Sequence, residues 1–207
     1  MLELKDVCLN LGGRKLADKL STGVNAGETL GIIGPAGSGK TALLRAIMGL
    51  QPVESGYISV DGELVTAGSA GYFRQMMAYV PQNLALPYDK VAEMVNDLIG
   101  LKTNRTSGYT QALLLREWEH LGLDKAVLEA SFTEVGEAQL RLILLSVLQL
   151  LGKQIFLVDT PAAGYDLEIT LDYLRGIARR GYAVVIMARD DRYAEYFDNR
   201  INLLTED

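Results

Sequence analysis

The chain has 207 residues, of which 49% are apolar, so it can bury the core of one domain, or of one domain with an inserted subdomain. It carries 20 basic and 26 acidic residues, and the resulting net charge of −6 is the wrong sign for a surface that follows nucleic-acid phosphates. Composition therefore excludes a disordered chain and argues against a nucleic-acid partner. The single cysteine, Cys8, cannot form an internal disulfide, and the uncharged apolar run over 142–152 is too short to span a membrane. We expect a cytosolic chain without direct membrane insertion.

Short apolar runs in the first third of the chain predict β-strands. Residues 2–9 alternate between apolar and polar side chains, and residues 29–33 form a compact apolar run that ends at a glycine. Residues 57–60 lead into the turn dipeptide Asp61-Gly62, and residues 77–80 are followed by a proline. This part of the chain is expected to be rich in β-structure.

The middle of the chain has helical periodicity from residue 91 to residue 151. Residues 139–151 are apolar nearly all round, which predicts a buried helix. The last third predicts two buried strands, over residues 155–158 and 183–187. A crossover helix is expected between them, over 167–179, and a final short strand over 201–204.

Residues 34–41 read GPAGSGKT and match the phosphate-loop pattern G-x-x-x-x-G-K-[S/T], between the predicted strand 29–33 and a helical stretch over 42–48. The glycines let the backbone turn tightly and aim N–H groups inward, while the helix directs its positive end at a triphosphate. We expect Lys40 to reach the β- and γ-phosphates and Thr41 to offer its hydroxyl to Mg²⁺. The nucleotide-binding residues expected in this loop are Gly34, Pro35, Ala36, Gly37, Ser38, Gly39, Lys40 and Thr41.

Other stretches resemble the ATP-binding cassette (ABC) family over nearly the whole chain. SGYISVDG at 55–62 is similar to the hairpin after the phosphate-loop helix, and RQMMAYVPQ at 74–82 is similar to the strand that leads into the Q-loop. IFLVD at 155–159 resembles the Walker B strand, and AGYD at 163–166 occupies the place of the D-loop.

The resemblance implies a single ABC nucleotide-binding domain over residues 1–207. The implied fold is an α/β P-loop NTPase of ABC type, with a mixed β-sheet core, an antiparallel β subdomain and an inserted helical subdomain. The core and the β subdomain are expected at 1–82 and 153–207, and the helical subdomain with the signature region at 83–152.

Two further residues enter the expected site. Asp159 ends a buried apolar strand, where a carboxylate is costly unless a cation such as Mg²⁺ satisfies it, although a carboxylate that caps the next turn is an alternative. Gln82 occupies the Q-loop position, so the resemblance implies that it contacts Mg²⁺ or water, whereas the residues alone would favour a solvated turn. The expected metal ligands are Thr41, Gln82 and Asp159.

Three positions depart from the family pattern near the nucleotide. Thr160 stands where the family usually places the glutamate that polarises the attacking water, and loss of a general base typically costs about 10² to 10⁴ in rate. Arg189 replaces the switch histidine; its guanidinium is expected either to pair with the γ-phosphate or to be an ordinary surface arginine. Leu11 takes the place of the aromatic that stacks on adenine and lacks a π face. Gln82 and Arg189 are the candidate catalytic residues.

The signature region departs as well, because the chain reads TEVGE at 133–137 where the family shows LSGGQ or LSGGE. With Gly136 and Glu137 anchored, Glu134 replaces the serine that would meet the γ-phosphate of the opposite subunit, and phosphate repels a carboxylate. A register shifted by one residue would offer Thr133 instead.

These observations predict the ATP-binding subunit of an ABC-type membrane transporter that binds ATP and Mg²⁺ and hydrolyses ATP slowly. It is expected to form a homodimer, or a heterodimer with another ABC subunit, and to lie peripherally on the inner face of the cell membrane through transmembrane partner subunits. Two alternatives remain open: a pseudo-ATPase that acts as a nucleotide-dependent switch or scaffold, and a soluble ABC protein outside transport.

Overall fold

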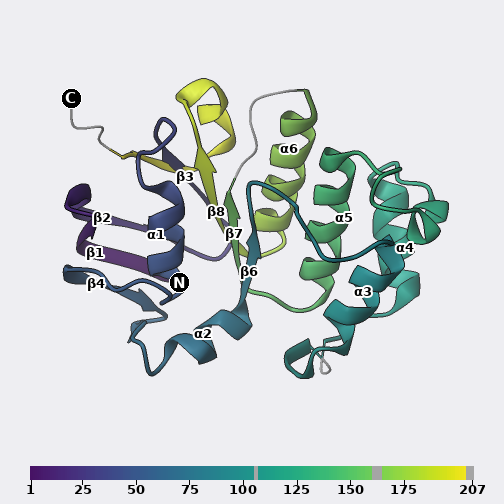
Figure 1. The fold of residues 1–207 in the computed structure, drawn as a ribbon, viewed down its shortest axis with the longest axis horizontal. Helices are drawn as coiled ribbons and strands as arrows, with labels where there is room; N and C mark the ends of the chain where they lie inside the picture. Colours follow the sequence, from purple (N-terminus) through teal and green to yellow (C-terminus); the bar gives the residue numbers. More distant parts are fainter. Residues whose placement is uncertain (105–106, 160–164, 204–207) are drawn as a thin grey trace.

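The computed structural model describes residues 1–104, 107–159 and 165–203 of the chain. Two β-sheets enclose the first helix, and the later helices cover the opposite face of the larger sheet (Figure 1). The helices are α1 (Lys40–Ile47), α2 (Ala70–Met76), α3 (Val91–Gly100), α4 (Gln111–His120), α5 (Glu137–Leu150) and α6 (Tyr165–Arg179), with short 3-10 helices η1 (Lys102–Asn104), η2 (Lys125–Glu129) and η3 (Asp191–Tyr196).

An antiparallel sheet forms one side of the molecule, in the order β2-β1-β4-β5. Its strands are β1 (Leu2–Leu11), β2 (Arg14–Val24), β4 (Ser55–Val60) and β5 (Glu63–Leu64). Strand β2 was not predicted from the sequence, because register shifts between β1 and β2 break the alternation of buried and exposed residues. Asp6 and Lys19 lie in these irregular stretches with φ values of 49° and 48°.

The second sheet is parallel in all its described pairs and has the order β6-β7-β8-β3-β9. Its strands are β6 (Met77–Val80), β7 (Ile155–Asp159), β8 (Ala183–Ala188), β3 (Thr29–Ile33) and β9 (Asn199–Asn202). Along β8, Val184 and Ile186 join the core under α5 and α6, whereas Val185 joins the core around α1. Both faces are therefore covered, which explains the continuous apolar runs. The mixed pairing expected for the fold is present, divided between two sheets.

Two predicted boundaries need correction. The final strand, predicted over 201–204, is Asn199–Asn202, and residue 204 lies outside the described residues. It pairs with β3 at the edge of the sheet, where Asn199 and Arg200 are exposed and give no apolar signal. The stretch 74–82 begins in α2, so only its central part is a strand.

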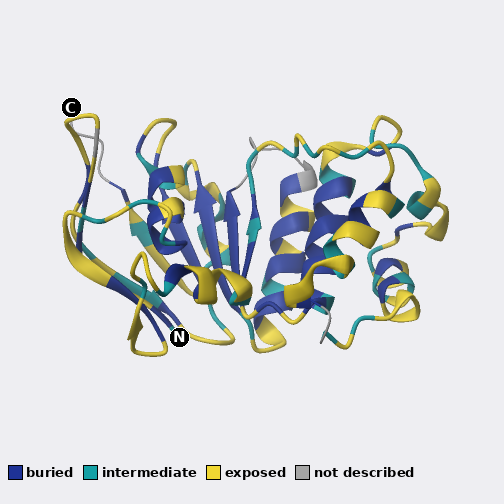
Figure 2. Cartoon of the chain, turned by 60° about the horizontal axis from the view of Figure 1, so that its bottom comes forward, coloured by how far each residue is buried: buried dark blue, intermediate teal, exposed yellow. Residues whose placement is uncertain are grey.

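Buried polar contacts tie α4, α5 and α6 together beneath the exposed outer surface, and α5 lies deep among its neighbours as predicted (Figure 2). Trp118 Nε1 donates a hydrogen bond to Ser146 Oγ at 2.9 Å. The Tyr173 hydroxyl lies 2.8 Å from Glu117 Oε1 and 3.0 Å from Gln149 Oε1. Burial, reinforced by Glu117, raises the pKa of Tyr173, so the phenol stays protonated and keeps its hydrogen bond. The subdomain boundaries at 83 and 152 remain predictions.

No helix within the described part of the chain is both long and apolar enough to cross a membrane.

The segment after β8 is fastened back onto β3. The ring of Phe197 lies against Gly31, so closely that a Cβ added to that glycine would be 2.2 Å from the ring. One residue further, the Asp198 carboxylate accepts hydrogen bonds from the backbone N–H and the hydroxyl of Thr29, each at 2.8 Å. These bonds hold the pKa of Asp198 below its usual range. The excursion through η3 therefore starts and ends at fixed points on the parallel sheet.

Candidate functional site

The loop between β3 and α1 has the curled backbone that a phosphate loop requires. Gly37 and Gly39 have φ values of 80° and 94°, a region that side chains rarely adopt. Gly34 is needed for space instead, because a Cβ there would lie 2.5 Å from Ser38 Oγ. The helix begins at Lys40 with Gly39 as its N-cap and no side-chain cap, so its first N–H groups face the loop.

Lys40 points into the concave side of this loop. Its ammonium donates hydrogen bonds to the carbonyl of Gly34, to the carbonyl of Pro35 at 2.7 Å and to Ser38 Oγ at 3.3 Å. Partial burial lowers the pKa of Lys40; Asp159 opposes this shift and Arg189 adds to it. A lysine held in this way can place its charge on an anion that enters the loop.

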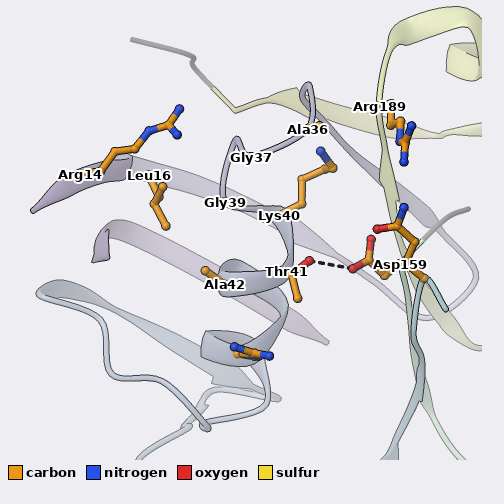
Figure 3. A pocket seen from close by; sticks show the side chains of 12 residues that line it. Arg14, Leu16, Ala36, Gly37, Gly39, Lys40, Thr41, Ala42, Asp159 and Arg189 are labelled. Carbon is orange, nitrogen blue, oxygen red and sulfur yellow. Dashed lines mark hydrogen bonds between the residues drawn. The ribbon is translucent and has the colours of Figure 1, made fainter. Parts of the chain in front are cut away.

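Thr41 and Asp159 meet beside the loop. The Thr41 hydroxyl donates to Asp159 Oδ2 at 2.8 Å, and Asp159 is 5% exposed at the end of β7 (Figure 3). Gln82, which follows β6, lines the same cavity of about 380 Å³ as Lys40, Thr41 and Asp159. Hydroxyl, carboxylate and amide oxygens are the hard ligands that Mg²⁺ takes, and Mg²⁺ usually completes its shell with phosphate oxygens and waters. The donor set therefore fits the expected ion together with a nucleotide.

Arg189 projects from the end of β8 into this cavity, on the side of Asp159 (Figure 3). The structure thus brings together residues expected from four separate stretches: the loop with Lys40 and Thr41, the Q-loop, the end of β7 and the switch position. Leu11 ends β1, but its side chain is not among those described. Thr160 and residues 163–164 also lie outside the described residues.

Four lining residues were not predicted from the sequence: Arg14 and Leu16 at the start of β2, and Ala42 and Arg45 on α1. The pair in β2 gave no signal in the sequence, because a register shift at Leu16 interrupts the alternation of the strand. Arg45 lies one helical turn after Thr41, a spacing that places both on one side of α1.

Arg141 is a fifth residue that was not predicted from the sequence. It is 1% exposed on α5, and its guanidinium donates to the carbonyls of Pro81 and Gln82 at 2.9 and 2.7 Å. Glu137 Oε1 lies 3.3 Å away, and Arg141 Nε has no hydrogen-bond partner within the described residues. Burial lowers the pKa of Arg141, against the opposing charges of Glu137 and Asp159. This guanidinium joins the helical side to the loop that carries Gln82.

The turn before α5 contains the predicted signature residues. Gly136 is the N-cap of α5, and Glu134 Oε2 accepts hydrogen bonds from the N–H and the hydroxyl of Ser131 at 2.8 and 3.0 Å. These bonds lower the pKa of Glu134, which is exposed and therefore ionised at neutral pH. Thr133 Oγ1 shares a hydrogen bond with Ser131 Oγ at 2.9 Å. The turn therefore presents an acidic surface, and its match to the family serine stays a prediction.

Comparisons with known proteins show the family of this chain. A model of the ABC transporter family matches residues 17–163. The manganese transport system ATP-binding protein MntB of Listeria innocua is 28% identical over 197 residues, which cover 90% of this chain and 79% of that protein. The hemin import ATP-binding protein HmuV of Photobacterium damselae is 26% identical over 212 residues, which cover 99% of this chain and 80% of that protein.

A solved structure shows the same fold. A putative ABC transporter ATP-binding protein from Pyrococcus furiosus superposes with a TM-score of 0.79 at 20% identity, over 98% of this chain and 96% of that one. The expected α/β P-loop NTPase fold of ABC type is confirmed. With a family match over more than half of its length and a phosphate loop of the required geometry, this chain belongs to the ABC transporter family as an ATP-binding domain.

Proposed function

We propose that this chain is the subunit of a membrane transporter that binds Mg-ATP, and that it hydrolyses ATP slowly. The observation that carries the proposal is one cavity lined by Lys40, the Thr41–Asp159 pair and Gln82 in a fold shared with ABC cassettes. The relatives named above belong to manganese transport and hemin import, which supports a role in transport.

The residues of the chain divide the work on the nucleotide. The loop N–H groups and the Lys40 ammonium hold the β- and γ-phosphates, because both face the concave side of the loop. Thr41, Gln82 and Asp159 would hold Mg²⁺, which supplies positive charge to the terminal phosphates. Arg189 enters from the side of Asp159 and pairs with the γ-phosphate.

Slow hydrolysis follows from the lack of a suitable base. Among the described residues that line the cavity, Asp159 is the one carboxylate, and it accepts the hydrogen bond of Thr41. The next residue in the sequence, Thr160, cannot take a proton at neutral pH. Proton abstraction from the attacking water therefore has no assigned acceptor, which costs about 10² to 10⁴ in rate.

Binding and turnover of the purified chain test this proposal. Titration calorimetry should show Mg-ATP binding, and phosphate release should be slow but measurable above background. Lys40→Ala should weaken ATP binding about tenfold to a hundredfold, because charge-assisted hydrogen bonds are worth about 1.5 to 3 kcal/mol. Lys5→Ala, which removes an exposed lysine from β1, is the matched control and should bind as the wild type does. Absence of ATP binding would refute the binding site, and brisk phosphate release would refute slow hydrolysis.

The same proposal places the chain at the cytoplasmic face of a membrane, as a dimer with a second copy or with another ABC subunit. It is expected to attach through transmembrane partner subunits. In cell fractionation the chain should sediment with membranes and be released by an alkaline carbonate wash, as a peripheral subunit is. A chain that stays in the supernatant of cells that contain its partners would contradict the transporter role.

A second candidate function is a nucleotide-dependent switch, and Arg189 favours it. A permanently charged guanidinium in the cavity can hold the ATP-bound form instead of responding to turnover. Tight ATP binding with phosphate release at background would support the switch, and release clearly above background that Lys40→Ala abolishes would support the transport ATPase.

A further inference from the structure

The hairpin that joins β1 and β2 forms the wall of the cavity opposite Asp159 and Arg189. Leu11 pairs with Arg14 across the two-residue turn Gly12-Gly13, and both glycines have positive φ values. Arg14 and Leu16 both line this wall, although a register shift at Leu16 interrupts the alternation of β2. Figure 3 shows them on one side of the phosphate loop, and Asp159 on the other.

These two side chains lie close to the loop itself. A Cβ added to Gly39 would lie 2.8 Å from Leu16 Cβ, and a Cβ added to Gly37 would lie 3.9 Å from Arg14 Nη1. Leu16 is 6% exposed and packs beneath the cavity, whereas Arg14 is exposed and reaches over it. This wall of the cavity thus combines the buried apolar side chain of Leu16 with the exposed planar guanidinium of Arg14.

Arg14 has no hydrogen bond or ion pair to any described residue. The nearby charges at this cavity include Lys40, Arg45 and Arg189, which repel a further cation. Its neighbour Lys15 behaves differently, because that side chain pairs with Asp18 at 2.7 Å. The guanidinium of Arg14 therefore lines the cavity without a partner among the described residues.

The direction of the nucleotide follows from the two walls. Thr41 and Asp159 would hold Mg²⁺, which would supply positive charge to the terminal phosphates, so the terminal phosphate is expected on the side of Thr41 and Asp159. The other end of the same molecule then leaves the loop towards Leu16 and Arg14. A nucleobase is flat and apolar on its faces, and a planar guanidinium stacks on such a surface.

We propose that Arg14 stacks its guanidinium on the nucleobase of the bound triphosphate, with Leu16 packed beneath, so that the site accepts purine triphosphates without distinguishing adenine from guanine. A stacked guanidinium contacts the face of the base and not its edge, and every base has a face. The inference rests on the nucleotide-binding function proposed above, and it adds the residue that holds the base.

Calorimetry with three ligands separates base stacking from phosphate binding. The ligands are Mg-ATP, Mg-GTP and magnesium tripolyphosphate, which has the phosphates and no base. The wild type should bind ATP and GTP within about threefold of each other. Arg14→Ala should weaken both nucleotides about tenfold and leave tripolyphosphate within about twofold of the wild type.

Two replacements at the same position sharpen the test. Arg14→Phe keeps a flat surface without a charge and should restore nucleotide affinity, whereas Arg14→Lys keeps the charge without the plane and should not. Lys15→Ala, on the opposite face of β2, is the matched control and should bind all three ligands as the wild type does.

The outcomes that overturn the inference are distinct. Equal losses for tripolyphosphate and ATP, or rescue by lysine but not by phenylalanine, would make Arg14 a phosphate ligand. Unchanged nucleotide affinity in Arg14→Ala, or a preference of the wild type for ATP over GTP well above threefold, would also overturn it. If the wild type binds neither ATP nor tripolyphosphate, the proposed function itself fails.

Discussion

The phosphate loop and the turn before α5 keep very different amounts of the family chemistry. In the loop, the motif is complete, Lys40 faces the concave side and Thr41 contacts Asp159 at 2.8 Å. In the turn, the carboxylate of Glu134 accepts hydrogen bonds from the N–H and the hydroxyl of Ser131 and adds negative charge. The phosphate loop therefore keeps the residues of its motif, whereas the turn predicted to hold the signature departs from the family pattern.

The difference teaches which features depend on the backbone. The loop is built from glycine conformations and N–H groups, so few single side-chain changes can alter it without unfolding the turn. The turn before α5 depends on one exposed side chain, which can change without affecting the fold. Binding and turnover can therefore separate within one domain.

The largest expected effect comes from repairing both altered positions at once. Thr160→Glu supplies a base and Glu134→Ser removes the repelling carboxylate. Each alone should change phosphate release less than about threefold, whereas the double variant should raise it about a hundredfold, within the range for a general base. A malachite-green phosphate assay on the purified chain measures this.

Glu129→Ser, an exposed change on η2, is the control for the loss of a surface carboxylate. A full rise from Thr160→Glu alone would show that the turn before α5 is functional as it stands. A double variant as slow as the wild type would show that the two regions are not what limits hydrolysis.

Much of the fold could be predicted from the sequence, because its signals are local. Strands β3 and β6 have the predicted bounds, since a glycine and a proline mark their ends. The strand β2 could not be predicted, because the register shifts between β1 and β2 hide its alternation. The last strand was placed too late, because its exposed edge carries polar residues.

The site residues within a sequence motif could be predicted, whereas the residues brought to the site by tertiary packing could not. Lys40, Thr41 and Asp159 meet as predicted, since the ends of parallel strands lie at one edge of a sheet. Arg14 and Arg141 reach the site or its neighbouring loop from distant parts of the chain, and no pattern links them to it. Arg141 did carry one signal, as a basic residue within an otherwise apolar helix.

A second prediction concerns the connection between the two regions, because Arg141 fastens α5 to the backbone before and at Gln82. Arg141→Met keeps the length of the side chain but leaves two carbonyls without their donor. An unsatisfied buried group costs about 1 to 3 kcal/mol, so the free energy of unfolding should fall by about 2 kcal/mol in urea denaturation. ATP affinity should fall as well, through displacement of Gln82.

Arg116→Met on the exposed face of α4 is the control and should change the free energy of unfolding by less than about 0.5 kcal/mol. A loss of stability without any change in ATP affinity would mean that Arg141 holds the fold but does not position Gln82. A change at α5 would then leave nucleotide binding at the phosphate loop unaffected.

The smallest expected effect tests whether Arg189 adds a contact to the γ-phosphate beside the phosphate loop. Arg189→Ala should weaken ATP binding about tenfold and ADP binding less than about twofold, because the γ-phosphate alone loses a charge-assisted partner. Arg192→Ala, an exposed arginine paired with Asp190, is the matched control in calorimetry. Equal affinities of both proteins for both nucleotides would make Arg189 an ordinary surface residue.

The fastening of Phe197 against Gly31 and of Asp198 to Thr29 has a mechanical consequence for Arg189. The segment that begins with this arginine returns to its own sheet within a few residues and is clamped there. A phosphate that displaces the guanidinium of Arg189 can therefore bend the short segment between the end of β8 and Phe197, while the strands below keep their register. A conformational change that passes from the nucleotide through Arg189 would therefore move this surface segment and not the sheet.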